Sequence, residues 1–364
     1  MKRPVDRWTV RWPPDGEPTV SSSVTGMRQA NWTPDGVELV EREPPPRPDG
    51  WARLAVSGCG ICGSDLHIYR GMRSGVIGPR DYAVPGHEMA GTVVDGPAGL
   101  DDGLYAVEPW LNCRACPSCA QGSSVLCQDA TLFGISGAGG LADLVDVPPR
   151  LLHRIPDAVD PTLAPLAEPW AVAVRAINRC GQIEVGERVL VLGAGTIGLL
   201  CGVAVRDRAA AVGITCRYPH QAALARRFGL TPVDPAELVE WAADHHPGRV
   251  IETVGGEADT MAQAVLSTRP GGRIVVVGVF ATPRPTDYRQ IVLRELEIVG
   301  SIYYGTAGSG SEFVIAVASL PDIVEELDAL QTHHFDLADT TDAFEAADDK
   351  SSQAVKVTLS PTPA

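Results

Sequence analysis

A glycine-rich turn, GAGTIG at residues 193–198, constrains the fold of this 364-residue chain more than any other feature. An apolar run at Arg188–Leu192 precedes the turn and indicates a buried strand, and an apolar helical pattern follows it. A second strand is expected at Ala211–Thr215, followed by a second helix. Between strand and helix in such a unit, glycines let the backbone approach a pyrophosphate, whose charge lies at the helix N-terminus. The pattern predicts a dinucleotide site formed by Gly193, Ala194, Gly195, Thr196, Ile197 and Gly198.

The alternation of strands and helices continues after this turn, whereas the sequence before it has a different texture. The segments RVIETVGG, ADTMAQAVLST, RIVVVG and LEIVG extend a doubly wound parallel sheet. Upstream, short alternating runs such as GVELVE and WARLAVSG lie between Pro and Gly turns, which indicates a β-rich module. We therefore predict an α/β fold in which a Rossmann domain, residues 176–304, is inserted in a β-rich catalytic domain, residues 27–175 and 305–364. Residues 1–26 are polar and Pro-rich and are interpreted as an N-terminal extension.

Four of the nine cysteines lie in the stretch NCRACPSCAQGSSVLC, with the spacing C-x2-C-x2-C-x7-C. The chain is long enough to bury a stable core without disulfides, and it shows neither a secretory signal nor an apolar run of membrane-spanning length. A cytoplasmic protein with reduced thiols is therefore expected. A bacterial ferredoxin run ends with x3 and a proline, whereas here the last gap is seven residues and Gln128 follows. Four such thiolates can enclose one structural Zn²⁺, which predicts a closed site formed by Cys113, Cys116, Cys119 and Cys127.

The charge balance excludes one reading of this cysteine cluster. The chain has 45 acidic and 30 basic residues, a net charge of −15. Nucleic-acid affinity rests largely on neutralisation of phosphates by Lys and Arg. We therefore expect no nucleic-acid partner, and a nucleic-acid-binding zinc ribbon is disfavoured. The lack of an apolar run of membrane-spanning length leads us to expect no membrane partner either.

A second group of potential metal ligands is spread over three segments. SGCGICGSDLH contains Cys62, Ser64 and His67, VPGHEMAG contains His87 and Glu88, and PLAEPW contains Glu168. Cysteine, histidine and carboxylate from separate segments are the ligand types of a catalytic zinc, which keeps one position open for water or substrate. Taken singly, each has an ordinary explanation as a buried cysteine, a hydrogen-bonded histidine or a solvated glutamate.

Taken together and in order, these motifs resemble the zinc-dependent medium-chain dehydrogenase/reductase family from about Met27 to Val357. The matching pieces are GICGSDLH, GHE, the four-cysteine segment, EP, GAGTIG, PGG and the closing AVKVTL. The resemblance implies a GroES-like catalytic domain around the Rossmann domain, one catalytic and one structural zinc, and a homodimer or homotetramer formed through the edge of the Rossmann sheet. It further implies oxidation or reduction of a secondary alcohol or ketone on a polyol, sugar or cyclitol.

The resemblance also assigns roles to individual residues. Cys62 and His87 would ligate the catalytic zinc, and Glu168 lies where the polyol-dehydrogenase branch has a glutamate as third ligand, acting directly or through water. Glu88 would ligate in exchange. Ser64 would accept the proton of the substrate hydroxyl and pass it toward His67. Gly278 and Ile302 are further cofactor contacts that the resemblance implies.

The choice of nicotinamide cofactor depends on the end of the second strand. An acidic residue there normally binds the adenosine ribose and selects NAD, but here the position is Cys216 and Arg217 follows. A guanidinium can pair with a 2′-phosphate through charge-assisted hydrogen bonds. The sequence therefore favours NADP, with Tyr218 as an adenine wall and His220 as a weaker phosphate partner. NAD stays possible if Arg217 is only a solvated side chain.

Two alternatives to a polyol dehydrogenase stay open at this point. A threonine-type amino-alcohol dehydrogenase would need a cation for the substrate carboxylate, and Arg70, Arg73 or Arg80 could supply it. A non-catalytic protein of this fold could bind zinc and nucleotide without turnover, although it would not need an open metal site. Among the remaining side chains, Trp110 and Trp170 could both line the cleft, with core packing favoured for at least one of them. Ordinary buried thiols are expected for Cys59, Cys180, Cys201 and Cys216.

Overall fold

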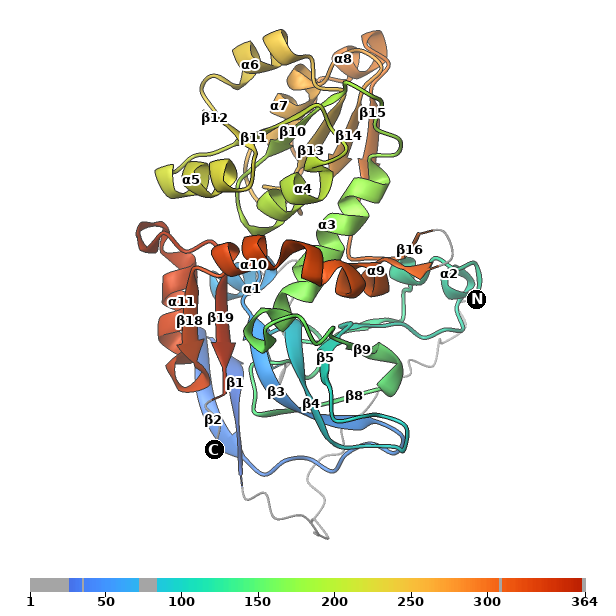
Figure 1. Ribbon diagram of the computed structural model, residues 1–364, viewed down its shortest axis with the longest axis vertical. Helices are drawn as coiled ribbons and strands as arrows, with labels where there is room; N and C mark the ends of the chain where they lie inside the picture. The colour runs from blue at the N-terminus through green and yellow to red at the C-terminus, as the bar shows by residue number, and fades with distance from the viewer. Residues whose placement is uncertain (1–25, 35, 72–83, 308–309, 362–364) are drawn as a thin grey trace, which may run out of the picture.

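The glycine turn lies at the carboxyl end of a central strand in a sheet of six parallel strands. The computed structural model describes residues 26–34, 36–71, 84–307 and 310–361. The strand order is β12-β11-β10-β13-β14-β15, and every neighbouring pair is parallel. This is the Rossmann sheet at the top of Figure 1, and helices cover its faces. Its strands are β10 (Arg188–Leu192), β11 (Ala211–Thr215), β12 (Thr231–Val233), β13 (Arg249–Glu252), β14 (Arg273–Val276) and β15 (Glu297–Gly300). Its helices are α4 (Thr196–Arg206), α5 (Pro219–Arg227), α6 (Leu238–His245), α7 (Thr260–Ser267) and α8 (Tyr288–Leu293).

Two glycines explain how the turn from β10 into α4 closes. Gly193 has φ +100°, a conformation that side chains disfavour. A Cβ on Gly198 would lie 1.8 Å from the carbonyl oxygen of Gly193, so only glycine fits there. The turn is thus as tight as the sequence predicts, and both flanking strands have the predicted bounds.

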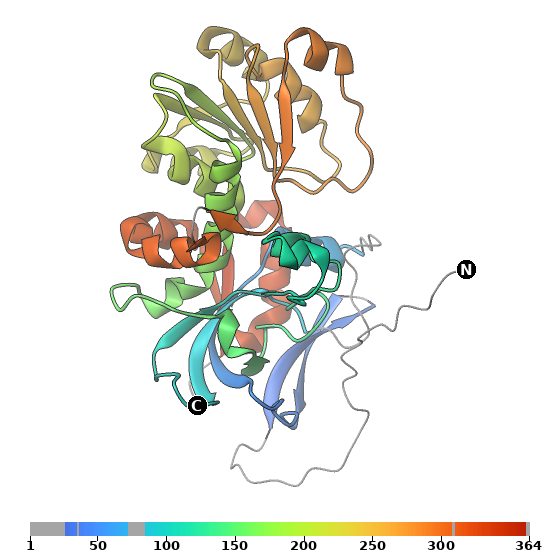
Figure 2. The same cartoon turned by 90° about the vertical axis from the view of Figure 1, so that its right-hand side faces the viewer.

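A second, mostly antiparallel sheet lies below the Rossmann sheet and contains strands from both ends of the described chain. Its order is β18-β19-β3-β4-β5-β9, with β8 also paired to β3. Figures 1 and 2 show the last strands, in red, beside strands from the first third of the chain. The strands are β3 (Ala52–Gly60), β4 (Glu88–Asp95), β5 (Leu104–Val107), β8 (Leu144–Val147), β9 (Leu152–Arg154), β18 (His333–Asp336) and β19 (Val357–Ser360). Short two-stranded pairings add β1 (Met27–Thr33) with β2 (Gly36–Arg42), β6 (Trp110–Leu111) with β7 (Thr131–Leu132), and β16 (Thr306–Ala307) with β17 (Gly310–Ser311).

One long helix connects the two parts. Helix α3 (Ala167–Arg179) contacts β4 of the lower sheet as well as α4 and α9 (Glu312–Ser319), and Figure 1 shows it running between them. Its buried face contributes to a core that continues from β4 and β5 into the Rossmann strands. The remaining helices are α1 (Gly63–Tyr69), α2 (Pro117–Ala120), α10 (Val324–Leu330) and α11 (Thr340–Asp348).

The predicted fold class is therefore confirmed: a β-rich, GroES-like part and a parallel Rossmann sheet. Within the described residues, no helix combines the length and the apolar character needed to cross a membrane. Residues 1–25 of the expected extension lie outside the described residues.

Candidate metal centres and dinucleotide site

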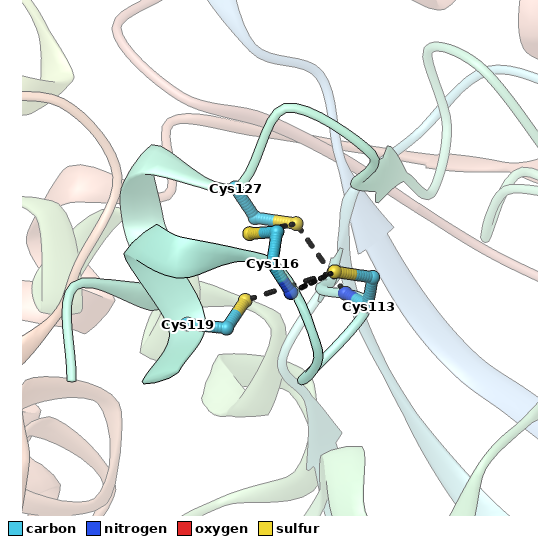
Figure 3. A group of neighbouring side chains, drawn as sticks. All are labelled: Cys113, Cys116, Cys119 and Cys127. Atoms are coloured by element: carbon cyan, nitrogen blue, oxygen red, sulfur yellow. Dashed lines mark hydrogen bonds between the residues drawn. The ribbon is translucent and has the colours of Figure 1, made fainter. Parts of the chain in front are cut away.

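The four-cysteine segment folds into a small lobe in which all four sulfurs converge (Figure 3). Cys113 follows β6, Cys116 precedes α2, Cys119 lies within it, and Cys127 follows the short 3-10 helix η1 (Ser124–Leu126). The Sγ atoms of Cys116 and Cys127 are 3.8 Å apart, and those of Cys113 and Cys119 are 4.0 Å apart. All nine cysteines are free thiols, so none of the four is used in a disulfide. We call residues 112–127 the cysteine lobe.

The geometry of the lobe fits a tetrahedral zinc ion. Four sulfurs bound at about 2.3 Å form a tetrahedron with edges of about 3.8 Å, close to the two separations above. Backbone N–H groups of Ala115 and Cys116 donate to Cys113 Sγ and lower the pKa of that thiol to about 7. Burial raises the pKa of Cys127 to about 12, so its ionisation would accompany metal binding. The four positions leave no ligand site for substrate, which indicates a structural role.

A second cluster forms where α1 meets the start of β4. Ligand atoms of Cys62, His87 and Glu88 lie within 4.8 Å of one another, with His87 and Glu88 buried. Cys62 is the residue before α1, His87 is the residue before β4 and Glu88 is the first residue of that strand, so two segments 25 positions apart supply the group. Sulfur, imidazole and carboxylate in this arrangement are a ligand set suited to zinc with an open position.

A buried aspartate, Asp65, lies beside the first two of these groups. It is fully buried, its Oδ2 accepts a hydrogen bond of 2.9 Å from the backbone N–H of Cys62, and Oδ2 lies 3.8 Å from His87 Nδ1. Burial raises the pKa of Asp65. Burial also disfavours the charged form of His87, but the negative charges of Asp65 and Cys62 outweigh this and hold the pKa of His87 well above its usual value. A carboxylate behind a ligand histidine fixes its ring orientation and strengthens it as a ligand.

The third member of the cluster, Glu88, pairs with a lysine from the far end of the chain. Lys356 is the residue before β19. It forms an ion pair with Glu88, and both side chains are only 1% exposed. Its Nζ also donates to the carbonyl oxygen of Ile61 at 2.9 Å. Burial opposes the charged form of Lys356, but the carboxylate of Glu88 raises its pKa above the usual value. A Cβ on Gly60 would lie 2.1 Å from Glu88 Oε2, so glycine makes room for the pair.

Glu168 approaches the same cluster from the first turn of α3. It is buried, but it is not one of the residues whose ligand atoms lie within 4.8 Å of one another. Burial raises the pKa of Glu168 to about 7, and the charge of Glu88 acts in the same direction. The charge of His87 opposes this shift in the pKa of Glu168. Glu168 therefore interacts electrostatically with the cluster, but its carboxylate is not among the ligand atoms that lie within 4.8 Å of one another.

The two residues expected to move a proton lie on α1. Ser64 Oγ is 3.5 Å from His87 Nε2, which places the hydroxyl beside the metal cluster. His67 is one turn further along the same helix and half-buried, and burial together with the charge of Arg70 lowers its pKa. The hydroxyl of Ser64 therefore lies at the metal cluster, and His67 lies on the same helix, one turn after Ser64.

Three hydrogen bonds hold the predicted dinucleotide turn and Gly278, the other glycine expected near the cofactor. The backbone N–H of Gly193 donates to Thr215 Oγ1 at 2.8 Å, at the end of β11. Thr196 Oγ1 donates to the carbonyl oxygen of Val355 at 2.7 Å, next to Lys356. The backbone N–H of Gly278 donates to the carbonyl oxygen of Glu252 at 3.1 Å. The glycine turn is therefore connected through Val355 and Lys356 to Glu88 of the metal cluster.

The residues expected to determine the selectivity between NADP and NAD follow β11. Cys216 is 9% exposed, and its Sγ donates to the carbonyl oxygen of Ile214 at 3.5 Å, directed into the sheet. Arg217 is exposed, and the rings of Tyr218 and His220 stack with centroids 5.6 Å apart. Ile302, expected near the cofactor, is 44% exposed.

Comparison with known proteins agrees with this arrangement. Residues 48–157 match the alcohol dehydrogenase GroES-like domain, and residues 196–338 match the zinc-binding dehydrogenase domain. The L-galactonate-5-dehydrogenase of Escherichia coli (strain K12) is 32% identical over 278 residues, which cover 72% of this chain and 80% of that protein. The chain belongs to the zinc-containing medium-chain alcohol dehydrogenase family. It is accordingly a zinc-dependent dehydrogenase that acts on CH–OH groups with NAD or NADP.

Other members of the family extend the comparison. The sorbitol dehydrogenase of Halalkalibacterium halodurans is 28% identical over 337 residues, 88% of this chain and 95% of that protein. A putative zinc-binding dehydrogenase from Sinorhizobium meliloti, solved bound to NADP, superposes with a TM-score of 0.83 at 26% identity and covers 93% of this chain and 100% of its own. The relatives include dehydrogenases of sugar acids, polyols and threonine, and solved relatives contain either NADH or NADP.

Sequence reasoning missed three residues that complete the site. Asp65 lies inside the motif GSDLH and Lys356 inside AVKVTL. The sequence around a single charged residue does not indicate whether its side chain is buried. Tyr304 follows β15 and carried no signal of its own. The expectations for the other side chains have clear outcomes: Trp170 is a buried core residue, Trp110 is half-buried, and the four remaining cysteines are buried. Of the three candidate arginines, Arg70 pairs with Asp348, and Arg73 and Arg80 lie outside the described residues.

Proposed function

We propose that this protein is an NADP-dependent zinc dehydrogenase that interconverts a secondary alcohol and a ketone on a polyol, sugar or cyclitol. The observation that carries the proposal is the joint placement of two carboxylates, Glu88 and Glu168, with Cys62 and His87 next to the dinucleotide turn. The family relatives named for sugar acids and sorbitol support a polyhydroxylated substrate.

In the proposed mechanism, Cys62 and His87 would hold the catalytic zinc. Glu168 would complete its ligands directly or through water, and Glu88 would replace it by exchange when released from Lys356. Bound there, zinc supplies Lewis acidity, which lowers the pKa of a substrate hydroxyl toward neutrality. The negative charge of Asp65 lies 3.8 Å from His87 Nδ1 and would favour the imidazole as a ligand, and Lys356 balances the buried charge of Glu88.

The proton and the cofactor are handled by neighbouring residues. Ser64, beside His87, would accept the proton of the substrate hydroxyl, and His67 would pass it to solvent. Residues 193–198 would bind the pyrophosphate through the backbone and the N-terminus of α4, with Gly278 and Ile302 along the nicotinamide half. His87, Glu88 and Glu168 are buried, which would limit the access of bulk water to the metal.

The homo-oligomer that the family resemblance implies would use the free edge of the Rossmann sheet. Strand β15 is the last strand in the sheet order, and Ile298 on it is 40% exposed. The adjacent helix α8 exposes Tyr288, Val292 and Leu293. We propose that this edge and helix form the interface of a homodimer or homotetramer, because pairing would cover both an unpaired strand edge and an apolar surface.

A threonine-type activity is the second candidate, because L-threonine 3-dehydrogenases are among the relatives. It would need a free cation near the reacting carbon to bind the substrate carboxylate. Arg70 forms an ion pair with Asp348. The relatives named for sorbitol and L-galactonate make a polyhydroxylated substrate the preferred class.

Turnover of a substrate panel tests the proposed function. Zinc-loaded protein with NADP should oxidise neutral polyols or cyclitols, and L-threonine should give a lower kcat/KM than the best of them. Steady-state absorbance at the NADPH band is the measurement. A zinc-loaded, cofactor-binding protein that oxidises no alcohol of the panel would favour the non-catalytic alternative, and a clear preference for L-threonine would favour the second candidate.

Cofactor preference gives a sharper prediction because it depends on one side chain. The exposed guanidinium of Arg217 should pair with the 2′-phosphate of NADP, and one charge-assisted contact is worth about 1.5–3 kcal/mol, roughly ten- to a hundredfold in kcat/KM. Arg217→Ala should therefore lose most of the preference for NADP over NAD while NAD turnover changes little. The measurement is kcat/KM for each cofactor at saturating alcohol.

Arg208→Ala is the matched control for this prediction, because Arg208 is also exposed but follows α4 rather than β11. It should keep the wild-type preference. A wild type that prefers NAD, or an Arg217→Ala variant with unaltered selectivity, would place recognition of the ribose elsewhere.

A further inference from the structure

A cavity of about 190 Å³ lies between the cysteine lobe and the strands β16 and β17. Figure 1 shows β16 beside α2 of the lobe. Residues of the lobe, of the GroES-like part and of the segment after β15 line the cavity, and none of them belongs to either metal cluster or to the glycine turn. We call it the lobe cavity, and its polar lining includes Glu108, Asn112, Arg114, Ser124, Arg150 and Thr306.

Two arginines from different elements line the lobe cavity. Arg114 lies between Cys113 and Cys116 of the lobe, and Arg150 lies in the 3-10 helix η2 (Pro149–Leu151). In the part of the chain that the structure describes, neither guanidinium has a carboxylate oxygen within 4.0 Å. Burial and the charge of Arg114 lower the pKa of Arg150, so the two positive charges repel each other. Both guanidinium groups therefore have donors available for an anion.

The backbone of Arg114 is strained. Its φ is +58°, in the left-handed region where glycine is favoured. The fold of the lobe enforces this conformation, because the backbone N–H groups of Ala115 and Cys116 both donate to Cys113 Sγ. Glycine would adopt the same conformation with less strain, so an arginine at this position costs stability. A strained residue of this kind is reason to look for a function of its side chain.

Neutral polar groups complete the lining of the lobe cavity. The side chains of Asn112, Ser124 and Thr306 contribute a carboxamide and two hydroxyls, and none of the three forms a hydrogen bond with another side chain or backbone group of the described residues. Arg150 Nη2 donates to the carbonyl oxygen of Asn112 at 3.1 Å, which holds this arginine against the lobe. Glu108 is the one acid among the lining residues, and its Oε2 lies 3.0 Å from His153 Nε2.

The size of the lobe cavity limits what it can bind. Pockets for drug-sized ligands usually have volumes of about 300–1,000 Å³, so about 190 Å³ is too small for a nucleotide and suits an anion of few atoms. Donors reach the cavity from the lobe, from η2 and from β16. A tetrahedral phosphate presents oxygens in all of these directions and pairs well with guanidinium groups, whereas a planar carboxylate presents only two oxygens.

We propose that the lobe cavity binds a phosphate group, with Arg114 and Arg150 pairing with its oxygens and the neutral side chains donating further hydrogen bonds. The ligand is inorganic phosphate or the phosphate group of a small metabolite, and Glu108 would accept a hydrogen bond from a hydroxyl of that metabolite. A bound phosphate would join the lobe, the GroES-like part and the segment after β15. The site is separate from those for the cofactor and the alcohol, so the proposal does not depend on the proposed function.

The zinc-loaded lobe is the rival partner for these two arginines. Four thiolates and one Zn²⁺ carry a net charge of about −2, which would attract Arg114 and Arg150 without any ligand in the cavity. The two explanations differ in what the guanidinium groups stabilise. In the first they hold a phosphate, and in the second they help the lobe to retain its metal.

Phosphate binding to the zinc-loaded protein saturated with NADPH is the test, because the cofactor then occupies the glycine turn and Arg217. Isothermal titration calorimetry at constant ionic strength should detect one phosphate site per chain, with a Kd of about 1 mM or lower. Arg114→Gln and Arg150→Gln should each raise this Kd about tenfold, and the double variant about a hundredfold. Arg208→Gln is the matched control: it removes an exposed arginine after α4 and should keep the wild-type Kd.

Two side chains at the cavity make the substitutions informative. Both arginines are exposed, so the variants should fold, and glutamine at position 114 keeps the backbone strain while removing only the charge. Glu108→Gln should have the opposite effect and lower the Kd for inorganic phosphate about threefold, because it removes the negative charge that faces the anion.

A comparison of two phosphates identifies the source of the ligand. Glycerol 3-phosphate should bind more tightly than inorganic phosphate if the ligand is an organic phosphate, and this advantage should disappear in Glu108→Gln. Equal or weaker binding of glycerol 3-phosphate would assign the cavity to inorganic phosphate. Zinc content, measured by elemental analysis in phosphate-free buffer, should be the same in the arginine variants as in the wild type.

Three results would overturn the proposal. A wild type that binds no phosphate in the presence of NADPH would show that the cavity does not take this ligand. Phosphate binding that persists unchanged in both arginine variants would place the phosphate elsewhere on the protein. Loss of one zinc ion per chain from the arginine variants, with no phosphate bound by the wild type, would assign the charges of Arg114 and Arg150 to the loaded lobe.

Discussion

Cys62→Ser should lower kcat/KM about a thousandfold or more while the protein stays folded, whereas Cys113→Ser should lower its stability. Cys62 lies in the open cluster with His87 and Glu88, where a metal provides several kcal/mol of transition-state stabilisation. Cys113 lies in the closed cysteine lobe, where metal binding contributes directly to folding. The measurements are steady-state kinetics, thermal unfolding and zinc content, which should be about two ions per wild-type chain and about one in each variant.

Cys180→Ala serves as the control for both variants, because Cys180 is buried outside either cluster. It should keep two zinc ions and wild-type kinetics. Exchanged phenotypes, with Cys113→Ser inactive but stable and Cys62→Ser unstable, would reverse the two assignments. Zinc near zero in folded, active protein would refute both sites.

The parts of this structure that local pattern controls could be predicted from the sequence. Strands β10 and β11 have the predicted bounds because each is a short apolar run ended by a turn. The GAGTIG turn forms because Gly193 needs a positive φ and Gly198 has no space for a side chain. The four sulfurs of the lobe converge because consecutive cysteines with only two to seven residues between them can meet without help from distant segments.

The rest of the site depends on contacts between distant segments, which the sequence does not encode locally. Glu88 and Lys356 are 268 positions apart in the sequence (356 − 88), and the pairing of β3 with both β4 and β19 brings them together. Glu168 could be assigned to the metal site through family resemblance, but its place just outside the tightest ligand group depends on where α3 packs. Arg114 and Arg150 likewise line one cavity only because the cysteine lobe and η2 converge.

Lys356→Met should lower the free energy of unfolding by about 3–5 kcal/mol, because it removes the only described cation paired with Glu88 and leaves that carboxylate buried without compensation. Methionine keeps most of the side-chain volume, so loss of packing contributes little. The measurement is urea unfolding of the zinc-loaded protein at constant pH. Lys350→Met is the matched control: Lys350 is exposed, and a surface substitution usually changes stability by less than about 0.5 kcal/mol.

A second variant separates loss of the ion pair from loss of a lysine. Adding Glu88→Gln to Lys356→Met removes the uncompensated charge and should restore most of the stability, since replacing both partners of a buried pair is often nearly neutral. Activity should not return with it if Glu88 takes part in ligand exchange at the metal. A Lys356→Met protein as stable as the wild type would show that Glu88 is compensated by another group, and the bound zinc ion is then the nearest candidate.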